Sequence, residues 1–283
     1  MIGLDRSHDP AGGNWIRIGA SRPGFERVDA GFSTFAFEPH RHDTYAVGVT
    51  LRGVQLFGYR GTTEHCAAGH AFILHPDERH DGHAGTASGF RYRILYLEPR
   101  LIQEALGGSG RPLPFARDAV TADGRVRAAI AAALEDIDVA VEDLQLDDVL
   151  VQLAHALAAR DRSVRHGLAA AANVRAAKAA RDYLDENVVR TVRSDALERA
   201  TGLTRFALAR HFRACFGTSP HRYVVMRRLD RTRSLLRAGR SLASAAVESG
   251  FADQSHMTRH FKKAYGLSPG RWCALAAGGA SLQ

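Results

Sequence analysis

Between residues 30 and 100, short apolar runs alternate with polar turn sequences. The runs are five to eight residues long and include Tyr45–Leu51, Val54–Tyr59, Ala71–His75 and Arg93–Leu97. The sequences that punctuate them are Arg52-Gly53, Arg60-Gly61, Ala68-Gly69 and Pro76-Asp77. Short strands interrupted this often favour an antiparallel barrel or sandwich over a series of βαβ units.

Beyond Asp123 the apolar spacing changes to three and four residues, which predicts two helices that each have one apolar face. The first stripe consists of Val126, Ile130, Leu134, Ile137 and Val141. The second consists of Leu146, Val149, Leu150, Leu153 and Leu157. These faces either pack back on the barrel or form a dimer seam, and the pattern leaves both open. The charged stretch from Arg160 to His166 is interpreted as a linker.

From Ala176 to Trp272 the pattern is helical, and two segments of it resemble each other. One begins at Ala196 and ends at Pro220, and the other begins at Ser244 and ends at Pro269. Each has a short helix, a glycine, an apolar residue, a capping residue, and a longer helix with the sequence Arg-His-Phe near its end. A duplication of this kind is hard to obtain by chance.

Each repeat has the parts of a helix-turn-helix. Gly202 and Gly250 would allow the tight turns, and Thr204 and Asp253 would cap the second helices. Leu208 with Phe212, and Met257 with Phe261, are spaced to face inward. The outward residues, which are the candidates for contacting DNA, are Arg205, Phe206, Ala209, Arg210 and Arg213 in the first unit and Gln254, Ser255, Thr258, Arg259 and Lys262 in the second.

These side chains suit the edges of base pairs. Arginine and glutamine can make paired hydrogen bonds to guanine and adenine, and Phe206 can contact a thymine methyl group. A helix over residues 221–237 would be about 25 Å long. As a rigid spacer it would set the two reading helices roughly one DNA turn, about 34 Å, apart.

The charge distribution agrees with a polyanionic partner for the second half only. The whole chain has a net charge of +8. Residues 174–283 hold 20 Lys and Arg against 8 Asp and Glu, a net of +12, whereas residues 1–173 have a net of −4. An Arg-rich proteome would instead make both halves basic.

Other features of the composition exclude several classes of protein. The three cysteines are widely spaced and form neither a disulfide framework nor a Cys-x-x-Cys site. No apolar run is long enough to span a membrane, and the N-terminus lacks the apolar core of a secretory signal. We therefore expect a cytoplasmic protein with no membrane association.

Residues 174–274 resemble the DNA-binding domain of the AraC/XylS family. The resemblance rests on AAVESGFADQSHMTRHFKKAYGLSPGRW (245–272) and on the parallel ATGLTRFALARHFRACFGTSPHRYV before it. It implies that the base-reading positions are Phe206, Ala209, Arg210, Ser255, His256 and Arg259. Ala209 departs from the larger polar residue often found there, so the first unit is expected to read fewer bases.

Residues 36–98 resemble the cupin-type sensor barrel of many regulators in that family. The matching residues are Pro39–Tyr45 and Ala68–Pro76, leading to His80. The resemblance implies an effector pocket lined by His40, His42, Tyr45, His80 and Arg93. In cupin enzymes a Glu follows the His-x-His, but no Glu lies in 45–47. His40, His42 and His80 are therefore either pocket lining, surface or core histidines, or three metal ligands, and pocket lining is preferred.

Taken together, we expect an α+β multidomain protein. It has a cupin-like antiparallel β-barrel with a helical extension (1–160), a linker (161–173) and an all-α double helix-turn-helix domain (174–283). The predicted function is sequence-specific transcription regulation in response to a small polar effector, without enzymatic activity or a cofactor. Expected partners are double-stranded DNA, the effector, RNA polymerase and, as an option, a second copy of the chain. A metal enzyme fused to a DNA-binding domain and a ligand-independent architectural DNA binder are the alternatives.

Overall fold

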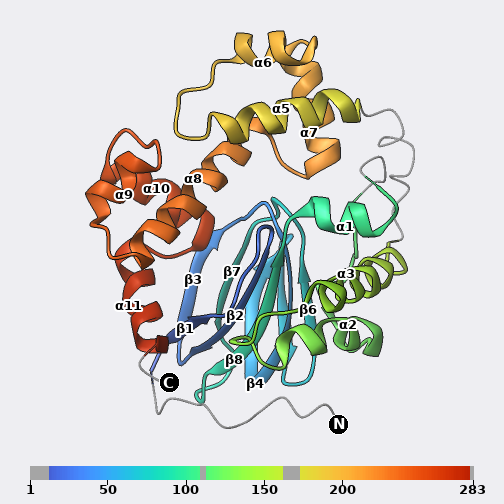
Figure 1. Cartoon of the computed structure of the whole chain (residues 1–283). Helices are drawn as coiled ribbons and strands as arrows, with labels where there is room; N and C mark the ends of the chain where they lie inside the picture. The colour runs from blue at the N-terminus through green and yellow to red at the C-terminus, as the bar shows by residue number, and fades with distance from the viewer. Residues whose placement is uncertain (1–12, 109–112, 162–172, 281–283) are drawn as a thin grey trace.

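The computed structural model describes residues 13–108, 113–161 and 173–280. We call 13–161 the N-terminal part and 173–280 the C-terminal part. Figure 1 shows an antiparallel sheet curled around an interior, with two helices along one side and the C-terminal helices above and on the opposite side. The predicted linker, 161–173, lies almost entirely outside the described residues. No helix within the described ranges is both long and apolar enough to cross a membrane.

Nine strands form the sheet of the N-terminal part. They are β1 (Trp15–Ile18), β2 (Phe25–Phe32), β3 (Phe35–His40), β4 (Tyr45–Tyr59), β5 (Thr62–Ala67), β6 (Ala71–Leu74), β7 (His80–Ala84), β8 (Phe90–Leu97) and β9 (Val120–Thr121). The main path is β1-β2-β8-β4-β6-β9, while β5 and β7 pair with β4, and β3 pairs with β7. Every pairing between these strands is antiparallel, as the short apolar runs predict.

The long strand β4 corrects one prediction. Arg52-Gly53 is not a turn, because β4 runs continuously through it and bends there. Gly53 has a φ of +70°, and a Cβ on it would lie 2.0 Å from the Gly89 carbonyl oxygen. The pairing of β4 with β8 also shifts register between Thr50 and Arg52. A glycine and an irregular register let one strand belong to both halves of the curled sheet.

Helices α1 (Pro99–Ala105), α2 (Gly124–Leu134) and α3 (Asp143–Ala158) share a core with the outer face of the sheet. Both predicted apolar stripes lie in that core, except that Leu146 is only partly buried. The stripes therefore pack on the sheet and are not a dimer seam. Ile137 and Val141 are buried as predicted, but they follow the end of α2 and belong to the connection to α3 rather than to the helix.

A buried ion cluster fastens α2 to the sheet. The Asp29 carboxylate is fully buried and accepts two hydrogen bonds from Arg91, at 3.0 and 2.7 Å, and one from Arg93 at 2.9 Å. Arg93 also donates to the Leu134 carbonyl, 2.7 Å away, at the last residue of α2. The arginines thus satisfy both a buried carboxylate and carbonyls that the helix end leaves without partners.

The C-terminal part contains seven helices among the described residues. They are α5 (Val174–Glu186), α6 (Ser194–Thr201), α7 (Arg205–Phe216), α8 (Pro220–Arg237), α9 (Leu242–Glu248), α10 (Gln254–Tyr265) and α11 (Pro269–Ala280). Pairs α6/α7 and α9/α10 are the two helix-turn-helix units, and α8 is the spacer predicted between them. Gly202 ends α6 at a φ of +68°, and Gly250 follows α9 at +85°. Thr204 and Asp253 cap α7 and α10 through their side-chain oxygens.

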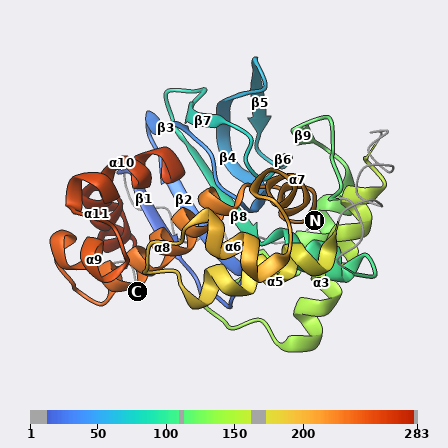
Figure 2. The same cartoon turned by 90° about the horizontal axis from the view of Figure 1, so that it is seen from above.

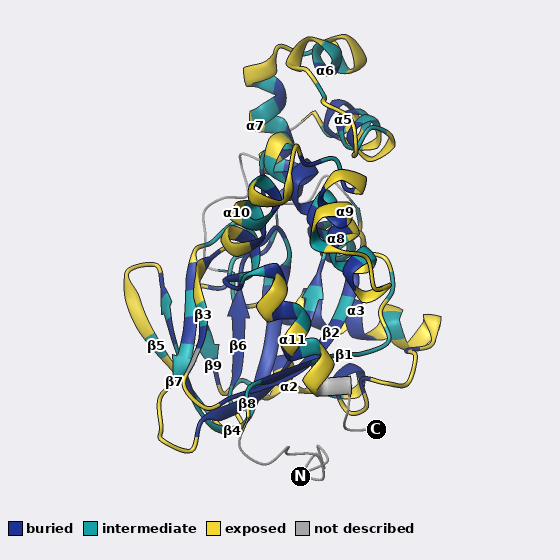
Figure 3. Ribbon diagram, turned by 90° about the vertical axis from the view of Figure 1, so that its left-hand side faces the viewer, coloured by how far each residue is buried: buried dark blue, intermediate teal, exposed yellow. Residues whose placement is uncertain are grey.

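The two helix-turn-helix units differ in how they are anchored. The first has a core of its own with α5 and the start of α8, including Leu208, Phe212 and Tyr223. The second shares one continuous core with the sheet interior, in which Met257, Phe261 and Trp272 lie together with residues such as Val28 and Ile94. Figure 3 shows α5, α6 and α7 standing away from the sheet, whereas α10 and α11 lie against it.

Candidate reading helices and an interdomain cavity

Helix α7 has one exposed face, which carries the residues predicted to contact DNA. Leu208 and Phe212 are buried, as predicted, while Arg205, Phe206, Arg210 and Arg213 are exposed. Ala209 is half-buried. Phe206 is 66% exposed, and the Arg205 guanidinium lies 4.9 Å from its ring centre. An exposed aromatic ring on this face can contact a thymine methyl group in a major groove.

Helix α10 presents the second face. Met257 and Phe261 are fully buried, whereas Gln254, Ser255, Arg259 and Lys262 are exposed and His256 and Thr258 are half-buried. The cap of Asp253 is tight, since its Oδ1 accepts the His256 amide hydrogen at 2.7 Å. His256 also lies with its Nε2 3.0 Å from that of His260, one turn further along the helix.

Both candidate reading helices, α7 and α10, touch the N-terminal part at their C-terminal ends. At α7, Arg213 lies 3.9 Å from the Asp77 carboxylate, and a Cβ on Gly217 would come within 3.1 Å of Pro76. At α10, the Gly266 carbonyl accepts the Glu38 amide hydrogen at 3.0 Å, and the Lys263 carbonyl accepts that of Arg41 at 3.1 Å. Figure 2 shows α7 above the sheet and α10 beside β3. The position of each helix therefore depends on the sheet.

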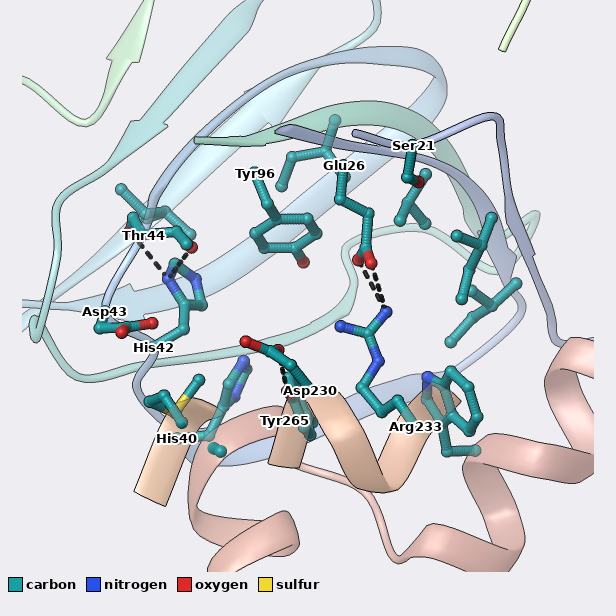
Figure 4. Close-up of a pocket in the computed structure, with 18 of the residues that line it drawn as sticks. Ser21, Glu26, His40, His42, Asp43, Thr44, Tyr96, Asp230, Arg233 and Tyr265 are labelled. Carbon is teal, nitrogen blue, oxygen red and sulfur yellow. Dashed lines mark hydrogen bonds and ion pairs between the residues drawn. The ribbon is translucent and has the colours of Figure 1, made fainter. Parts of the chain in front are cut away.

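A cavity of about 440 Å³ lies between the two parts. Its apolar wall comes mainly from the sheet interior and includes Ile16, Val28, Phe72, Leu74 and Ile94. The opposite wall comes from α8, the end of α10 and the start of α11. Figure 4 shows Arg233, Asp230 and Tyr265 facing Glu26, Tyr96 and His42 across it.

Ion pairs join the two parts around this cavity. Arg233 donates to both carboxylate oxygens of Glu26 at 2.7 Å. Arg227 donates to Asp43 at 3.0 Å and is also paired with Glu98. Burial raises the pKa of Asp43 to about 6, although Arg227 acts in the opposite direction. Two arginines of α8 therefore hold three carboxylates of the N-terminal part.

The structure brings the three predicted histidines together on the cavity wall. His40, His42 and His80 have ring centres 4.2 to 6.2 Å apart and are each at most 8% exposed. Burial is the largest cause that lowers their pKa values, and that of His80 falls to about 4. Within the described ranges, no group of three or more His, Cys, Asp or Glu is arranged to hold a metal ion. The three rings do not fit a metal site of the cupin type.

Tyr45 and Arg93 do not line this cavity, in contrast to the predicted pocket. The Tyr45 hydroxyl donates to the Pro114 carbonyl at 2.7 Å in the outer core, and Arg93 belongs to the Asp29 cluster. The reason is the alternation of side chains along a strand. In β8 the residues that do line the cavity are Tyr92, Ile94 and Tyr96, so Arg93 must point to the other face.

The sequence interpretation missed the wall contributed by the C-terminal part. Arg227, Arg233, Tyr265 and Trp272 line the cavity, as do Ile16, Glu26 and Val28 from β1 and β2. The apolar residues of α8, α10 and α11 signalled burial but not the partner they pack against. The strands β1 and β2 lie mostly before the region in which strands were predicted.

Comparisons with known proteins agree with this two-part arrangement. Residues 22–154 match the family model described as an AraC-like ligand binding domain, and residues 197–274 match a helix-turn-helix domain. The chain is 24% identical over 228 residues to the uncharacterized HTH-type transcriptional regulator YbfI of Bacillus subtilis, covering 78% of this chain and 81% of YbfI. It is 33% identical over 79 residues to the transcriptional regulator MtrA of Neisseria gonorrhoeae, covering 28% of this chain and 26% of MtrA.

Solved structures of ToxT from Vibrio cholerae share the whole fold. One superposes with a TM-score of 0.64 at 13% identity, covering 89% of this chain and 98% of ToxT. Another, ToxT bound to an unsaturated fatty acid, has a TM-score of 0.62 at 12% identity and covers 96% and 98%. At such identities the likeness establishes the fold alone. With both domain models matched in this order, the chain belongs to the AraC family of transcription regulators, with a ligand-binding domain followed by a helix-turn-helix DNA-binding domain.

Proposed function

We propose that this protein binds specific DNA sequences through α7 and α10, and that a small molecule in the interdomain cavity controls this binding. The observation that carries the proposal is that one cavity is walled by both the ligand-binding domain and the second helix-turn-helix unit. A ligand there touches both parts at once. It can therefore favour one relative position of the parts over another, which is what a ligand must do to shift an equilibrium.

The DNA-reading part of the proposal rests on the exposed faces of α7 and α10. Each would enter the major groove, with Arg210 and Arg259 reading base edges and Lys262 contacting phosphate. The 18 residues of α8 give a spacer of about 27 Å. The two helices would then address successive major-groove faces from one side of the duplex.

The structural neighbour ToxT supports the binding of a small molecule by this fold, but neither its position nor its identity here. A ToxT structure holds an unsaturated fatty acid. Here the cavity residues themselves must identify the ligand, because 12% identity does not carry a ligand over.

Further partners form part of the same proposal. The protein would act in the cytoplasm, have RNA polymerase as a partner and act as a regulator rather than an enzyme. For self-association, the surface that remains is the outer side of α3, where Leu144 is 83% and Val151 41% exposed. Sedimentation of wild type and Leu144→Asp tests this, since a dimer through α3 should become a monomer in the variant. A wild type that is monomeric at micromolar concentration would remove α3 from the proposal.

The base-reading assignment is tested on DNA selected by the protein from genomic fragments. Arg210→Ala and Arg259→Ala should each cost about 1–3 kcal/mol at the selected site and relax preference at one base position. Lys262→Ala should instead weaken selected and random DNA alike. Equal losses for all three variants on both DNAs would show that the base readers are wrongly assigned.

A further inference from the structure

The two polar ends of the interdomain cavity differ in what they can offer a ligand. Figure 4 shows the Glu26–Arg233 pair at one end and His40, His42 and Asp43 at the other, with Tyr96 between them. The apolar wall between these ends can hold a hydrocarbon body. The head group of the ligand must then match the hydrogen-bonding capacity that the protein has left unused.

Three of the four arginines that the structure describes on the cavity wall are already paired. Arg233 is bonded to both oxygens of Glu26, Arg227 to Asp43 and Glu98, and Arg22 to Asp143. The fourth arginine on the wall, Arg237, is exposed near the end of α8. The Nε atoms of Arg227 and Arg233 are buried without a hydrogen-bond partner among the described residues, but each guanidinium is already paired with protein carboxylates. A ligand carboxylate would therefore add negative charge to a wall that already has more carboxylates than arginines.

The histidines, in contrast, offer acceptors. The Nδ1 atoms of His40, His42 and His80 lie 2.9, 3.0 and 3.1 Å from the carbonyl oxygens of Glu38, Thr44 and Glu78. A carbonyl oxygen only accepts, so each Nδ1 carries the hydrogen and each neutral ring has a bare lone pair on Nε2. The Nε2 of His42 is buried without a hydrogen-bond partner among the described residues.

Asp43 adds a fourth acceptor and negative charge. Its Oδ2 is paired with Arg227, while its Oδ1 is buried without a hydrogen-bond partner within the described part of the chain. The cavity wall as a whole has five carboxylates, from Glu26, Asp43, Asp81, Glu98 and Asp230, against four arginines. A buried acceptor without a donor is unfavourable by about 1–3 kcal/mol, so a ligand that supplies the donors is favoured.

We propose that the effector is an amphiphilic amine, whose ammonium group donates its three hydrogen bonds to Nε2 of His42, to Nε2 of His80 and to Oδ1 of Asp43, and whose hydrocarbon body fills the apolar part of the cavity. Burial keeps the three imidazoles uncharged at neutral pH, so they do not repel the cation. This inference rests on the proposed function for the cavity and specifies its ligand class.

The head group is tested with three probes of equal chain length on the full-length protein. Calorimetry at pH 7.5 compares n-octylamine, n-octanoate and n-octanol. The amine, protonated at this pH, should bind at least about tenfold more tightly than either of the others, because only it supplies several donors and a positive charge. Octanoate or octanol binding as tightly as octylamine, or no binding by octylamine, would overturn the proposal.

The acceptors are tested by substitutions that keep the ring shape. His42→Phe and His80→Phe should each weaken octylamine binding on the order of tenfold, since each removes one hydrogen bond to a charged group. His42→Gln, which keeps an acceptor, should restore most of the affinity. His65→Phe is the matched control, because His65 is exposed on β5 outside the cavity, and it should bind octylamine like wild type.

Two further outcomes would overturn the assignment. One is unchanged octylamine binding in both Phe variants when circular dichroism shows them folded. The other is stoichiometric binding of Zn²⁺ alone that is lost in His80→Phe, which would make the histidines a metal site. DNA binding is measured separately on the same wild-type protein. Sequence-specific binding there would show that the DNA-binding part of the proposed function holds even if octylamine does not bind.

Discussion

Asp29 links the outer side of the sheet to α2 through buried arginines. It is fully buried between Arg91 and Arg93, and Arg93 reaches the end of α2. Replacing it by Asn leaves two buried guanidinium groups without their counter-charge. We expect Asp29→Asn to lower the free energy of unfolding by about 3–5 kcal/mol in urea denaturation.

Asp138 provides the control for that measurement. It pairs with Arg17 at 3.0 Å, but its side chain is 45% exposed. Asp138→Asn should therefore cost less than about 1 kcal/mol. Similar losses for the two variants would mean that burial does not set the strength of these ion pairs.

His80 gives the protein a dependence of stability on pH with a defined sign. Its pKa is about 4 in the folded protein and about 6.5 when unfolded. The unfolded chain therefore takes up a proton first as the pH falls, and stability is lost between about pH 6.5 and 4. His80→Asn should remove a loss on the order of 3 kcal/mol across this window, measured by urea denaturation at a series of pH values.

Asp43 changes the stability of the folded protein with pH in the opposite direction to His80. Its contribution cancels when wild type and His80→Asn are compared. Its raised pKa of about 6 favours the folded state as the pH falls toward the ordinary value of a carboxyl group. Asp43 is present in both proteins, so the difference between wild type and His80→Asn reports on His80 together with its effect on the pKa values of His40 and His42, which it lowers. Identical pH profiles for the two proteins would contradict a buried, neutral His80.

Side-chain direction was the part of the site that could be predicted from the sequence but was not. The histidines at 40, 42 and 80 were identified from the resemblance to cupin-type barrels and do line the cavity. Tyr45 and Arg93 were placed there without regard to strand alternation. Alternate residues of a strand face opposite sides of the sheet, so either Arg93 or the set Tyr92, Ile94 and Tyr96 can face the interior. The second set is the more apolar, and on that ground the sequence already favoured it as the cavity lining.

At the scale of elements, the contact between α10 and β3 rests on Gly266. This residue ends α10 at a φ of +67°, and a Cβ on it would lie 2.6 Å from the Glu38 carbonyl oxygen. Gly266→Ala should therefore separate α10 from β3. We expect faster hydrogen exchange at the Glu38 and Arg41 amides, which are bonded to the end of α10, and an altered affinity for DNA.

Gly202 is the matched control, because it ends α6 at nearly the same φ, +68°, with nothing within 4 Å of its Cβ position. Gly202→Ala carries the same backbone strain, about 1 kcal/mol, without the clash. Exchange at Glu38 and Arg41 should then match wild type. If both variants accelerate exchange at these amides equally, the strain rather than the close approach is responsible.

Local elements could be predicted because their signals are local. The duplicated pattern placed α7 and α10 correctly, since caps, turn glycines and inward apolar pairs all lie within each repeat. The bend of β4 was missed because Arg52-Gly53 is a typical turn sequence. The close approach of the Gly89 carbonyl to Gly53, which requires a glycine within the strand, cannot be seen from the local sequence. The far wall of the cavity joins segments about 200 residues apart, such as Glu26 and Arg233, for which one sequence has no pattern.

For the whole molecule, the charge difference between the halves predicts a steep response of DNA binding to salt. Residues 174–283 have a net charge of +12, and phosphate contacts release condensed counterions. With about six such contacts, affinity should fall by about 10³ between 50 and 200 mM salt. Fluorescence anisotropy measures the slope, which Lys262→Ala should reduce by about one, while Arg117→Ala in the ligand-binding domain should not change it. A flat response would contradict the electrostatic interpretation.

The continuous core makes a further prediction for the isolated C-terminal part. A fragment of residues 173–283 contains both reading helices and their spacer, so it should keep sequence preference. It should also expose the faces of Phe261 and Trp272 that now pack toward the sheet interior. We expect the fragment to bind an apolar dye more strongly than the full-length chain. Dye binding no stronger than that of the whole protein would mean that the second unit does not need the sheet to cover it.

The same shared core limits how such regulators can exchange parts in evolution. The first helix-turn-helix unit has a core of its own, so its reading surface can diverge, or be grafted from a relative, at little structural cost. The second unit is different, because every residue that Met226, Phe261 or Trp272 touches in the sheet must change with it. Viable hybrids between relatives are therefore expected to exchange α5, α6 and α7 alone, with α8, α10 and α11 kept together with their own sheet. The DNA sites of related regulators are then expected to differ most in the half that α7 is proposed to read.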